Sequence, residues 1–531
     1  MAALQRSILV FLLFTMLSAS ALAQVTHLAG QAPAAVSATV PQQVAAPPQA
    51  PELAGLSAYI KEAMADWEVP GLAIAVVKDG EVIFAEGFGE RVLGSGGMVD
   101  EHTLFAIAST TKAMTVAALG MLVDEGVMDW DDRVIDHLPT LRLADPYVTR
   151  HLRIRDLLSH RTGVSRSDNV WIAGPFDRKE VVRRARFLEQ VRGFREGYGY
   201  NNIMFMIAGE VVEAAAGMPW ADFVESRLFE PLGMKRSTPR AAVVAARENV
   251  AGSHTRSNSR VIHVPHRDYD ALGPAGSVFS SAHDMARWVR LQLNHGTFEG
   301  NRLLDSVTVA EMHAAQTVME VDSVDQRLFP STHFRAYGLG WRMQDYHGRK
   351  IVQHTGSVNY MRTQVGMIPE EEIGFVAFAN LSSSDLQSAL MYRVFDALLG
   401  VPETDWSAEY LTLDRRSNQR AQERQRELEE ARMEGTEPSL ARDAYAGTYA
   451  DSLYGQMVVS QEDGGLVLRY TPDYTADLSH WHHDTFRAQW RRPGYGHSFV
   501  TFTLDPRGQV ESMEVPGFTD FGRVREEQEG G

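Results

Sequence analysis

The chain has 531 residues, and not one of them is cysteine. This absence excludes a disulfide framework, a thiolate metal site and a cysteine that carries a lipoprotein acyl chain. Basic residues are scarce relative to acidic ones, with 51 Lys and Arg against 68 Asp and Glu and a formal net charge of −17. A phosphate backbone is bound by clustered Lys and Arg, and no basic stripe occurs, so we expect no nucleic-acid partner.

Two motifs of common hydrolases are also missing. No His is followed by Glu, which excludes the H-E-x-x-H zinc proteases, and no G-x-S-x-G motif marks an α/β-hydrolase. The segment His480 to Asp484 is rich in histidine, but neighbouring residues of a strand point to opposite faces. We interpret this segment as a solvent-facing strand, and we predict neither a metal nor an organic cofactor.

Long hydrophobic runs are absent except near the N-terminus. Arg6, the apolar run Ile8 to Leu17 and the small residues before Gln24 follow the order of a secretory signal peptide, residues 1–23. The alternative, a membrane anchor, is disfavoured because the run is too short to span a bilayer comfortably. Residues 24–50 are rich in Ala, Pro and Gln and predict a flexible tether. We therefore expect a periplasmic or secreted protein without a membrane anchor after cleavage.

The whole sequence has 44% apolar and 22% charged residues, a composition typical of globular proteins. Two strand-like runs meet at Asp79-Gly80, a pair suited to a tight hairpin turn. Further elements are predicted as helices at 110–126, 209–216 and 282–294 and as strands at 364–368 and 373–379. Residues 51–405 are thus predicted to form an α+β domain, an antiparallel sheet flanked by helices with an inserted helical region.

Two further segments complete the chain. Residues 406–440 mix Arg, Glu and Gln with almost no apolar face, which predicts a charged helical connector. Residues 441–528 alternate like strands around Gly-containing turns, which predicts a small β-rich, barrel-like domain. Two roles stay open for this domain, closing over a substrate cleft or promoting oligomerisation. The sequence does not fix an oligomeric state, and an oligomer is compatible with it.

Ser109 and Lys112 form an S-x-x-K pair at the start of a predicted helix. Three residues make nearly one helical turn, so the Lys112 amine is expected on the same face as the Ser109 hydroxyl. An amine accepts a hydroxyl proton only when it is neutral, and both burial and the positive end of a helix lower a lysine pKa from about 10.4. The pair alone is a weak signal, because S-x-x-K often arises by chance.

Two more motifs strengthen the signal of the S-x-x-K pair. Tyr200-Asn201-Asn202 precedes an apolar helical run, and His354-Thr355-Gly356-Ser357 lies beside a strand of the late sheet region. In this order and spacing, the three motifs resemble the active-site triplet of the serine β-lactamase and penicillin-binding-protein-like hydrolases. The likeness is greatest to the class C β-lactamases with related esterases, D-aminopeptidases and D-alanyl-D-alanine carboxypeptidases. The likeness covers residues 53 to 400. Within this range it includes five further segments, 69–71, 157–163, 231–234, 276–288 and 337–341.

The resemblance implies a set of catalytic roles. Ser109 would be the nucleophile and Lys112 its proton acceptor. Tyr200, through a phenolate or through a proton shared with Lys112, would act as general base and later as acid to the leaving group. We interpret His160 and Arg161 as packing contacts rather than as catalysts.

The resemblance also implies substrate-binding residues. Asn202 would hold the Lys112 amine and a substrate amide, and the backbone N–H groups of Ser109 and Ser357 would form the oxyanion hole. Thr355 and Gly356, between His354 and Ser357, belong to the same substrate-binding strand. No metal or cofactor is needed for this chemistry.

One position departs from the β-lactamase pattern, which has lysine where this chain has His354. A fixed cation there favours a substrate carboxylate, whereas histidine titrates near neutrality and binds an anion less dependably. The same substitution occurs among relatives that resemble esterases and amide hydrolases. We therefore predict acyl transfer and doubt efficient β-lactam hydrolysis. For His354 itself three roles stay open: orienting Tyr200, contacting substrate, or packing.

Two functions are compatible with these residues. The first is an exported serine hydrolase that forms an acyl-enzyme with an amide or ester, either a small molecule or a peptide. The second is a catalytically silent, penicillin-binding-like sensor of cell-wall fragments. The intact Ser109, Lys112 and Tyr200 favour the enzyme.

Overall fold

The structure is a computed structural model that describes residues 50–257 and 260–525. The described residues belong to one compact unit. The predicted signal peptide, and all but the last residue of the predicted tether, lie outside the described residues.

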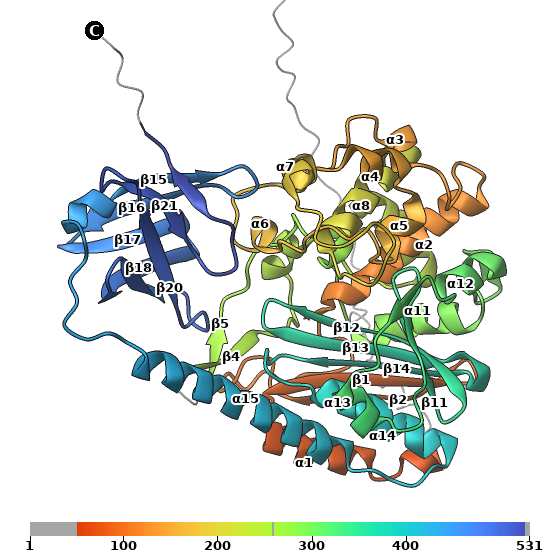
Figure 1. Cartoon of the computed structure of the whole chain (residues 1–531). Coiled ribbons are helices and arrows are strands. Elements are labelled where there is room, and N and C mark those ends of the chain that lie inside the picture. The colour runs from red at the N-terminus through yellow and green to blue at the C-terminus, as the bar shows by residue number, and fades with distance from the viewer. Residues whose placement is uncertain (1–49, 258–259, 526–531) are drawn as a thin grey trace, which may run out of the picture. The chain divides into compact units, whose positions relative to one another are not determined.

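The centre of the first domain is an eight-stranded antiparallel sheet with the strand order β2-β1-β14-β13-β12-β11-β10-β9 (Figure 1). Strands from both ends of the domain lie side by side in it, because β1 pairs with β14. The predicted α+β fold class is therefore confirmed. The sheet strands are β1 (Gly71–Lys78), β2 (Glu81–Gly89), β9 (Thr317–Met319), β10 (Arg335–Tyr337), β11 (Arg342–Tyr346), β12 (Arg349–Val358), β13 (Met361–Ile368) and β14 (Ile373–Ala379).

The hairpin β1–β2 turns at the predicted dipeptide. Asp79 and Gly80 both have positive φ, 52° and 78°, which a tight hairpin turn requires and which glycine adopts without a steric cost. Along β1, alternate residues enter two different cores: Ala73, Ala75 and Val77 on one face, Leu72, Ile74 and Val76 on the other. Burial on both faces explains why the strand is continuously apolar.

Helices cover both faces of the sheet (Figure 1). The core on one face includes residues of α1 and α14, and the core on the other includes residues of α2, α8 and α11. The helices are α1 (Leu56–Trp67), α2 (Thr111–Asp124), α3 (Val134–His137), α4 (Pro146–His151), α5 (Ile154–Leu158), α6 (Asn169–Ile172), α7 (Arg178–Arg184), α8 (Asn202–Ala216), α9 (Trp220–Val224), α10 (Glu230–Leu232), α11 (Ala282–Leu293), α12 (Ser306–Met312), α13 (Ser323–Leu328), α14 (Leu386–Leu399) and α15 (Trp406–Glu430).

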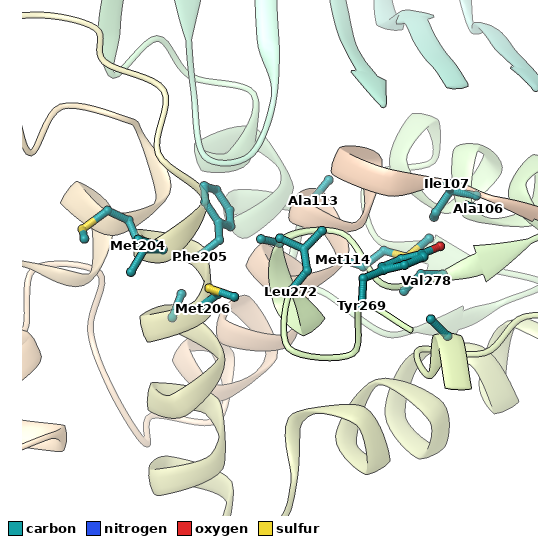
Figure 2. Packing of buried hydrophobic residues seen from close by; sticks show 14 of the residues in the cluster. Ala106, Ile107, Ala113, Met114, Met204, Phe205, Met206, Tyr269, Leu272 and Val278 are labelled. Atoms are coloured by element: carbon teal, nitrogen blue, oxygen red, sulfur yellow. The ribbon is translucent and has the colours of Figure 1, made fainter. Parts of the chain in front are cut away.

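The core beneath the predicted site joins α2, α8 and the segment 269–278. Figure 2 shows Phe205 of α8 near Leu272, with Met114 of α2 and Val278 further along the same cluster. Helix α2 is buried from Thr111 to Leu122 on all sides, so its sequence has no polar stripe. A lysine inside this helix is consequently withdrawn from water.

Among the described residues, no single helix is long and apolar enough to cross a membrane. One bent pair, Asn202–Ala216 with Trp220–Leu232, meets the criteria by length and composition only.

Of the predicted charged connector, residues 406–440, the part Trp406–Glu430 is helical and forms α15. Only Trp406, Ser407 and Leu411 of this helix are buried. The chain then enters a closed eight-stranded barrel, which confirms the β-rich C-terminal domain. The barrel strands are β15 (Gly447–Asp451), β16 (Gly455–Glu462), β17 (Gly465–Thr471), β18 (Tyr474–His482), β19 (Thr485–Trp490), β20 (His497–Leu504), β21 (Val510–Glu514) and β22 (Phe521–Arg523).

Three two-stranded ribbons lie outside the sheet and the barrel. They pair β3 (Phe105–Ala106) with β6 (Phe279–Ser280), β4 (Ser253–Ser257) with β5 (Arg260–Val264), and β7 (Thr297–Phe298) with β8 (Asn301–Arg302). The first ribbon leads directly into the turn that carries Ser109.

Candidate active site

Ser109 lies in a 3-10 turn, Ala108–Thr110, that continues directly into α2. Ala108 precedes it with φ 51°, a left-handed conformation that is unusual for a residue with a Cβ. Strain of this kind is concentrated at functional sites. The turn leaves Ser109 partly exposed to solvent while Lys112, one turn later, is fully buried. The predicted helix therefore begins beside the serine, and it ends at Asp124.

The Lys112 amine has three hydrogen-bond partners. Its Nζ lies 3.1 Å from Ser109 Oγ, 2.7 Å from Asn202 Oδ1 and 2.7 Å from the carbonyl oxygen of Ala275. The amide and carbonyl oxygens accept hydrogen bonds and cannot donate them. An ammonium would donate to all three oxygens, and a neutral amine would donate to two of them and accept the Ser109 hydroxyl proton, so both protonation states fit this geometry.

The electrostatic environment decides between the two protonation states and favours the neutral form. Burial lowers the pKa of Lys112 well below its usual value, and although Asp168 opposes the shift, Arg166 and Arg342 add to it. A buried ammonium loses hydration that the protein replaces only in part. Lys112 is therefore placed to receive a proton from Ser109.

Tyr200 completes a triangle with these two residues. Its hydroxyl lies 2.8 Å from Ser109 Oγ, and its ring centroid lies 4.9 Å from Lys112 Nζ. Burial raises the pKa of Tyr200 far above its usual value, although the hydrogen bond to Ser109 opposes the shift. The resting phenol is consequently protonated and donates to Ser109. The raised pKa of Tyr200 disfavours a resting phenolate, and the proton shared with Lys112 stays a prediction.

Strand β12 brings the predicted binding motif against the serine turn. A Cβ on Gly356 would lie 2.4 Å from the Ile107 carbonyl oxygen and 3.2 Å from Ser109 N, so only glycine lets the strand approach this closely. Thr355 is partly exposed and Ser357 is exposed, both on this strand. The backbones of Ser109 and Ser357, the predicted oxyanion donors, thus lie on neighbouring segments.

His354 is fully enclosed and both of its ring nitrogens are occupied. Nδ1 lies 2.6 Å from the Thr355 carbonyl, so Nδ1 carries the proton, and Nε2 accepts from the Tyr337 hydroxyl at 2.9 Å. Burial lowers its pKa well below the usual value, and Arg342 and Lys112 add to the shift. His354 is therefore neutral near pH 7 rather than titrating there, and its ring lies 6.3 Å from that of Tyr200.

Arg342 supplies the fixed charge that His354 lacks. It begins β11, opposite Gln353 in the sheet, and it has no ion pair with a carboxylate in the described part of the chain. Burial lowers its pKa, but the neighbouring phenols of Tyr198 and Tyr337 outweigh this and raise it overall. Sequence reasoning missed Arg342 because it lies outside all three motifs.

Asp168 is a second residue that the sequence did not reveal. It accepts from Asn202 Nδ2 at 3.0 Å and from Trp171 Nε1 at 2.9 Å. One of the two Asn202 amide N–H groups is thus taken, which leaves the other for a substrate carbonyl. The predicted bond from Asn202 to Lys112 is present, with Asp168 fixing which end of the amide faces the amine.

His160 belongs to the same assembly. Its ring lies 4.2 Å from that of Tyr200 and 4.5 Å from that of Tyr337, and Nδ1 accepts from the Asn201 N–H at 3.1 Å. Burial lowers its pKa well below the usual value. The interpretation as a packing residue fits these contacts, and one of the rings that His160 packs against is that of Tyr200.

Groups of three or more side chains suited to a metal ion do not occur in residues 50–257 or 260–525. Within the His480–Asp484 segment, Trp481 is buried and His483 is exposed. The chemistry available at the site is that of one serine hydroxyl, one neutral amine and one protonated phenol.

Comparison with known proteins places this site in a family. The family model described as Beta-lactamase matches residues 56–398, and a second, "Domain of unknown function (DUF3471)", matches residues 431–530. "Unguisins hydrolase ungD" of Aspergillus violaceofuscus (strain CBS 115571) is 30% identical over 452 residues, 78% of each chain. "Penicillin-binding protein 4" of Amycolatopsis lactamdurans is 31% identical over 344 residues, 62% of this chain and 85% of its own.

Solved structures share the fold across both domains. The octameric penicillin-binding protein homologue from Pyrococcus abyssi aligns with a TM-score of 0.59 and 22% identity, over 87% of this chain and 98% of its own. The crystal structure of SurE aligns with a TM-score of 0.54 and 22% identity, over 89% of this chain and 99% of its own. At this identity the likeness concerns the fold alone.

Proposed function

This chain belongs to the Beta-lactamase family, and from that premise we propose that it is a serine hydrolase that forms an acyl-enzyme on Ser109 with an amide or ester substrate. The observation that carries the proposal is the contact triangle at Ser109 Oγ, with Lys112 Nζ at 3.1 Å and Tyr200 Oη at 2.8 Å. A hydroxyl with a neutral amine on one side and a phenol on the other has both a proton acceptor and a proton donor.

Acylation would proceed in two steps. Ser109 Oγ attacks the substrate carbonyl carbon while its proton passes to Lys112, and the carbonyl oxygen becomes an oxyanion facing the N–H groups of Ser109 and Ser357. The bond to the leaving group then breaks as Tyr200 donates its phenolic proton to the leaving nitrogen or oxygen. The Lys112 ammonium returns a proton to Tyr200, which restores the neutral amine.

Deacylation would run the same proton path in reverse. Water attacks the ester carbonyl, and Tyr200 accepts its proton as Lys112 takes the phenolic one. Collapse of the second tetrahedral intermediate releases the acid and regenerates Ser109 with a proton from Lys112. No step requires a metal or a cofactor.

The substrate class follows from the site and from the relatives' names. Hydrolysis is supported by a relative named as an unguisins hydrolase, and binding of a penicillin-like molecule by one named as a penicillin-binding protein. His354 is neutral and enclosed, so the cation that β-lactamases place there is absent. We propose peptide-like amides and simple esters as substrates, with weak β-lactam turnover.

The test uses the full chain with p-nitrophenyl acetate and a fluorophosphonate probe. We expect steady hydrolysis of the ester and one covalent adduct per chain by intact mass, both abolished in Ser109→Ala. A wild type that takes no label and releases no p-nitrophenol would contradict the proposal. It would favour the silent sensor of cell-wall fragments instead.

We also propose that the protein is exported, to a periplasm or to the medium. The support is the order of charged, apolar and small residues within residues 1–23. N-terminal sequencing of the exported protein is expected to begin at Gln24. Recovery of a chain that keeps residues 1–23 in the cell interior would overturn this proposal without touching the hydrolase.

A further inference from the structure

A cavity of about 210 Å³ opens beside the oxyanion strand. Ser357 lies in its wall, followed along the chain by Val358, Asn359 and Tyr360. Three more aromatic residues line it, Trp171 from α6, Tyr269 from the segment before α11, and Tyr495 from the barrel. Lys112, Tyr200 and His354 do not line it, so it is a separate compartment next to the reacting carbonyl.

The barrel wall of this cavity is held firmly in place. Tyr495 lies in the loop between β19 and β20, and its hydroxyl accepts from Arg267 Nη1 at 2.6 Å. Tyr360 donates to the carbonyl of Pro493, in the same loop, at 3.1 Å. Each of the two tyrosines is thus tied to the opposite domain, and the cavity has a preformed shape.

The charges around the cavity are largely neutralised. Arg267 forms an ion pair with Asp473 at 3.0 Å and also donates to the carbonyl of Ile172. Asp268 is exposed to solvent. Four aromatic rings with a paired arginine provide a surface for an apolar group rather than for an ion.

The position of the cavity determines which half of the substrate enters it. Tyr200 donates the leaving-group proton, so the leaving group lies on the Tyr200 side of Ser109. The cavity is lined by Ser357 to Tyr360 at the end of β12 and not by Tyr200, so we assign it to the acyl half. A neighbouring groove of about 690 Å³ shares Trp171, Arg267, Asp268 and Tyr269 with it, so a longer acyl chain has room to continue.

We propose that the C-terminal barrel completes an acyl-side specificity pocket, in which Tyr495 contacts an aromatic or large aliphatic side chain next to the scissile carbonyl. The substrate class is an amide or ester with such an acyl group, preferably one extended as a peptide. The inference rests on the proposed hydrolase function and assigns the barrel a direct part in substrate choice.

The test compares two esters with the same leaving group, p-nitrophenyl acetate and p-nitrophenyl 3-phenylpropanoate. The readout is the ratio of kcat/KM for the phenylpropanoate to that for the acetate, so effects on shared chemistry cancel. Tyr495→Ala is expected to lower the ratio about tenfold, since a hydrophobic contact of this size discriminates to that extent. Tyr495→Phe keeps the ring and should hold the ratio within about threefold, the effect of one hydrogen bond.

Two further variants keep the test decisive. Tyr360→Ala removes the facing ring from the catalytic domain and should lower the same ratio even if Tyr495→Ala fails to fold. Phe499→Ala, on β20 beside Trp481 and outside the cavity, should leave the ratio unchanged. An unchanged ratio in folded Tyr495→Ala and Tyr360→Ala, with acetate still hydrolysed through Ser109, overturns this inference alone. Absence of hydrolysis and labelling in the wild type overturns the proposed function.

Discussion

Ser109 depends on neighbours that differ in what they can donate and accept. Lys112 lies within hydrogen-bond distance of Ser109 Oγ and of two acceptor oxygens, and burial lowers its pKa, which favours the neutral amine. Tyr200 keeps its proton because burial raises its pKa. At the residue scale, the two auxiliary groups therefore have different roles: the amine accepts the serine proton, and the phenol donates a proton to the leaving group of the substrate.

This division predicts separate effects of the two residues. Tyr200→Phe should reduce kcat for an amide by about 10²–10⁴-fold, the usual contribution of a general acid. It should still take a fluorophosphonate label on Ser109, because the departing fluoride needs no proton. Intact mass after timed labelling gives the comparison, with Lys112→Met as the variant expected to lose both activities. Equal loss of labelling in the two variants would contradict the division.

Arg342 gives a second prediction at this scale. It lies near Tyr200 and carries a charge that pH does not remove, whereas His354 is neutral. A substrate with a carboxylate on its leaving group should gain from this charge. In Arg342→Gln the ratio of kcat/KM for 3-carboxyphenyl acetate to that for phenyl acetate should fall about tenfold, the value of one charge-assisted hydrogen bond. A ratio that does not move would show that Arg342 serves packing alone.

At the scale of elements, the sequence predicted those parts whose pattern is long and local. Helix α2 and the hairpin β1–β2 have continuous apolar runs with turn residues at their ends, and they occur close to the predicted positions. Strands β9 and β10 were missed because each has three residues, too few to reveal a period. The barrel strands are predicted only as one alternating region, because polar and aromatic residues interrupt the alternation of strands such as β15 and β19.

The sequence predicted those site residues that belong to contiguous motifs. Ser109, Tyr200 and His354 were placed by their motifs, and the structure gathers these motifs in one place. Asp168, Arg342 and the carbonyl of Ala275 come from segments without a motif, and only the tertiary fold brings them to Lys112 or Tyr200. Long-range placement of single side chains is what sequence patterns do not contain.

Gly356 offers a prediction at the scale of elements. A methyl group there would clash with the Ile107 carbonyl, so β12 would move away from the serine turn. Gly356→Ala should lower stability by about 1–3 kcal/mol, as overpacking does, and should reduce acylation of Ser109 strongly. Gly465→Ala is the matched control, because a Cβ there meets only one atom at 3.7 Å. Denaturant unfolding and labelling rates measure both effects, and wild-type behaviour of Gly356→Ala would contradict the close approach.

At the scale of the whole molecule, one carboxylate joins the catalytic domain to the barrel. Asp473 pairs with Arg267 of the catalytic domain at 3.0 Å and with Arg492 of the barrel at 2.9 Å. The side chains of the two arginines are only 20% and 10% exposed. Partly buried cations that share one carboxylate are costly to leave unpaired.

Asp473→Asn should therefore destabilise the protein by about 1–2 kcal/mol, more than a surface ion pair contributes. Asp477→Asn is the control, since its only arginine partner in the described chain, Arg491, has a side chain that is 46% exposed. Its loss should cost no more than about 0.5 kcal/mol. Urea unfolding followed by tryptophan fluorescence compares the two variants, and equal midpoints would contradict the joining role of Asp473.

The central claim is that Lys112 is a neutral amine at working pH, and the chain allows a direct measurement of it. The sequence contains six lysines, Lys61, Lys78, Lys112, Lys179, Lys235 and Lys350. In a protein labelled with 13C at the lysine ε-carbon, the Lys112 signal is assigned by its loss in Lys112→Met and followed against pH. Because burial lowers its pKa, the signal should titrate far below about 10.4. The value of kcat/KM should fall as pH drops through the same midpoint, since protonation removes the acceptor. A Lys112 midpoint near 10.4, in an enzyme fully active at neutral pH, would contradict the account.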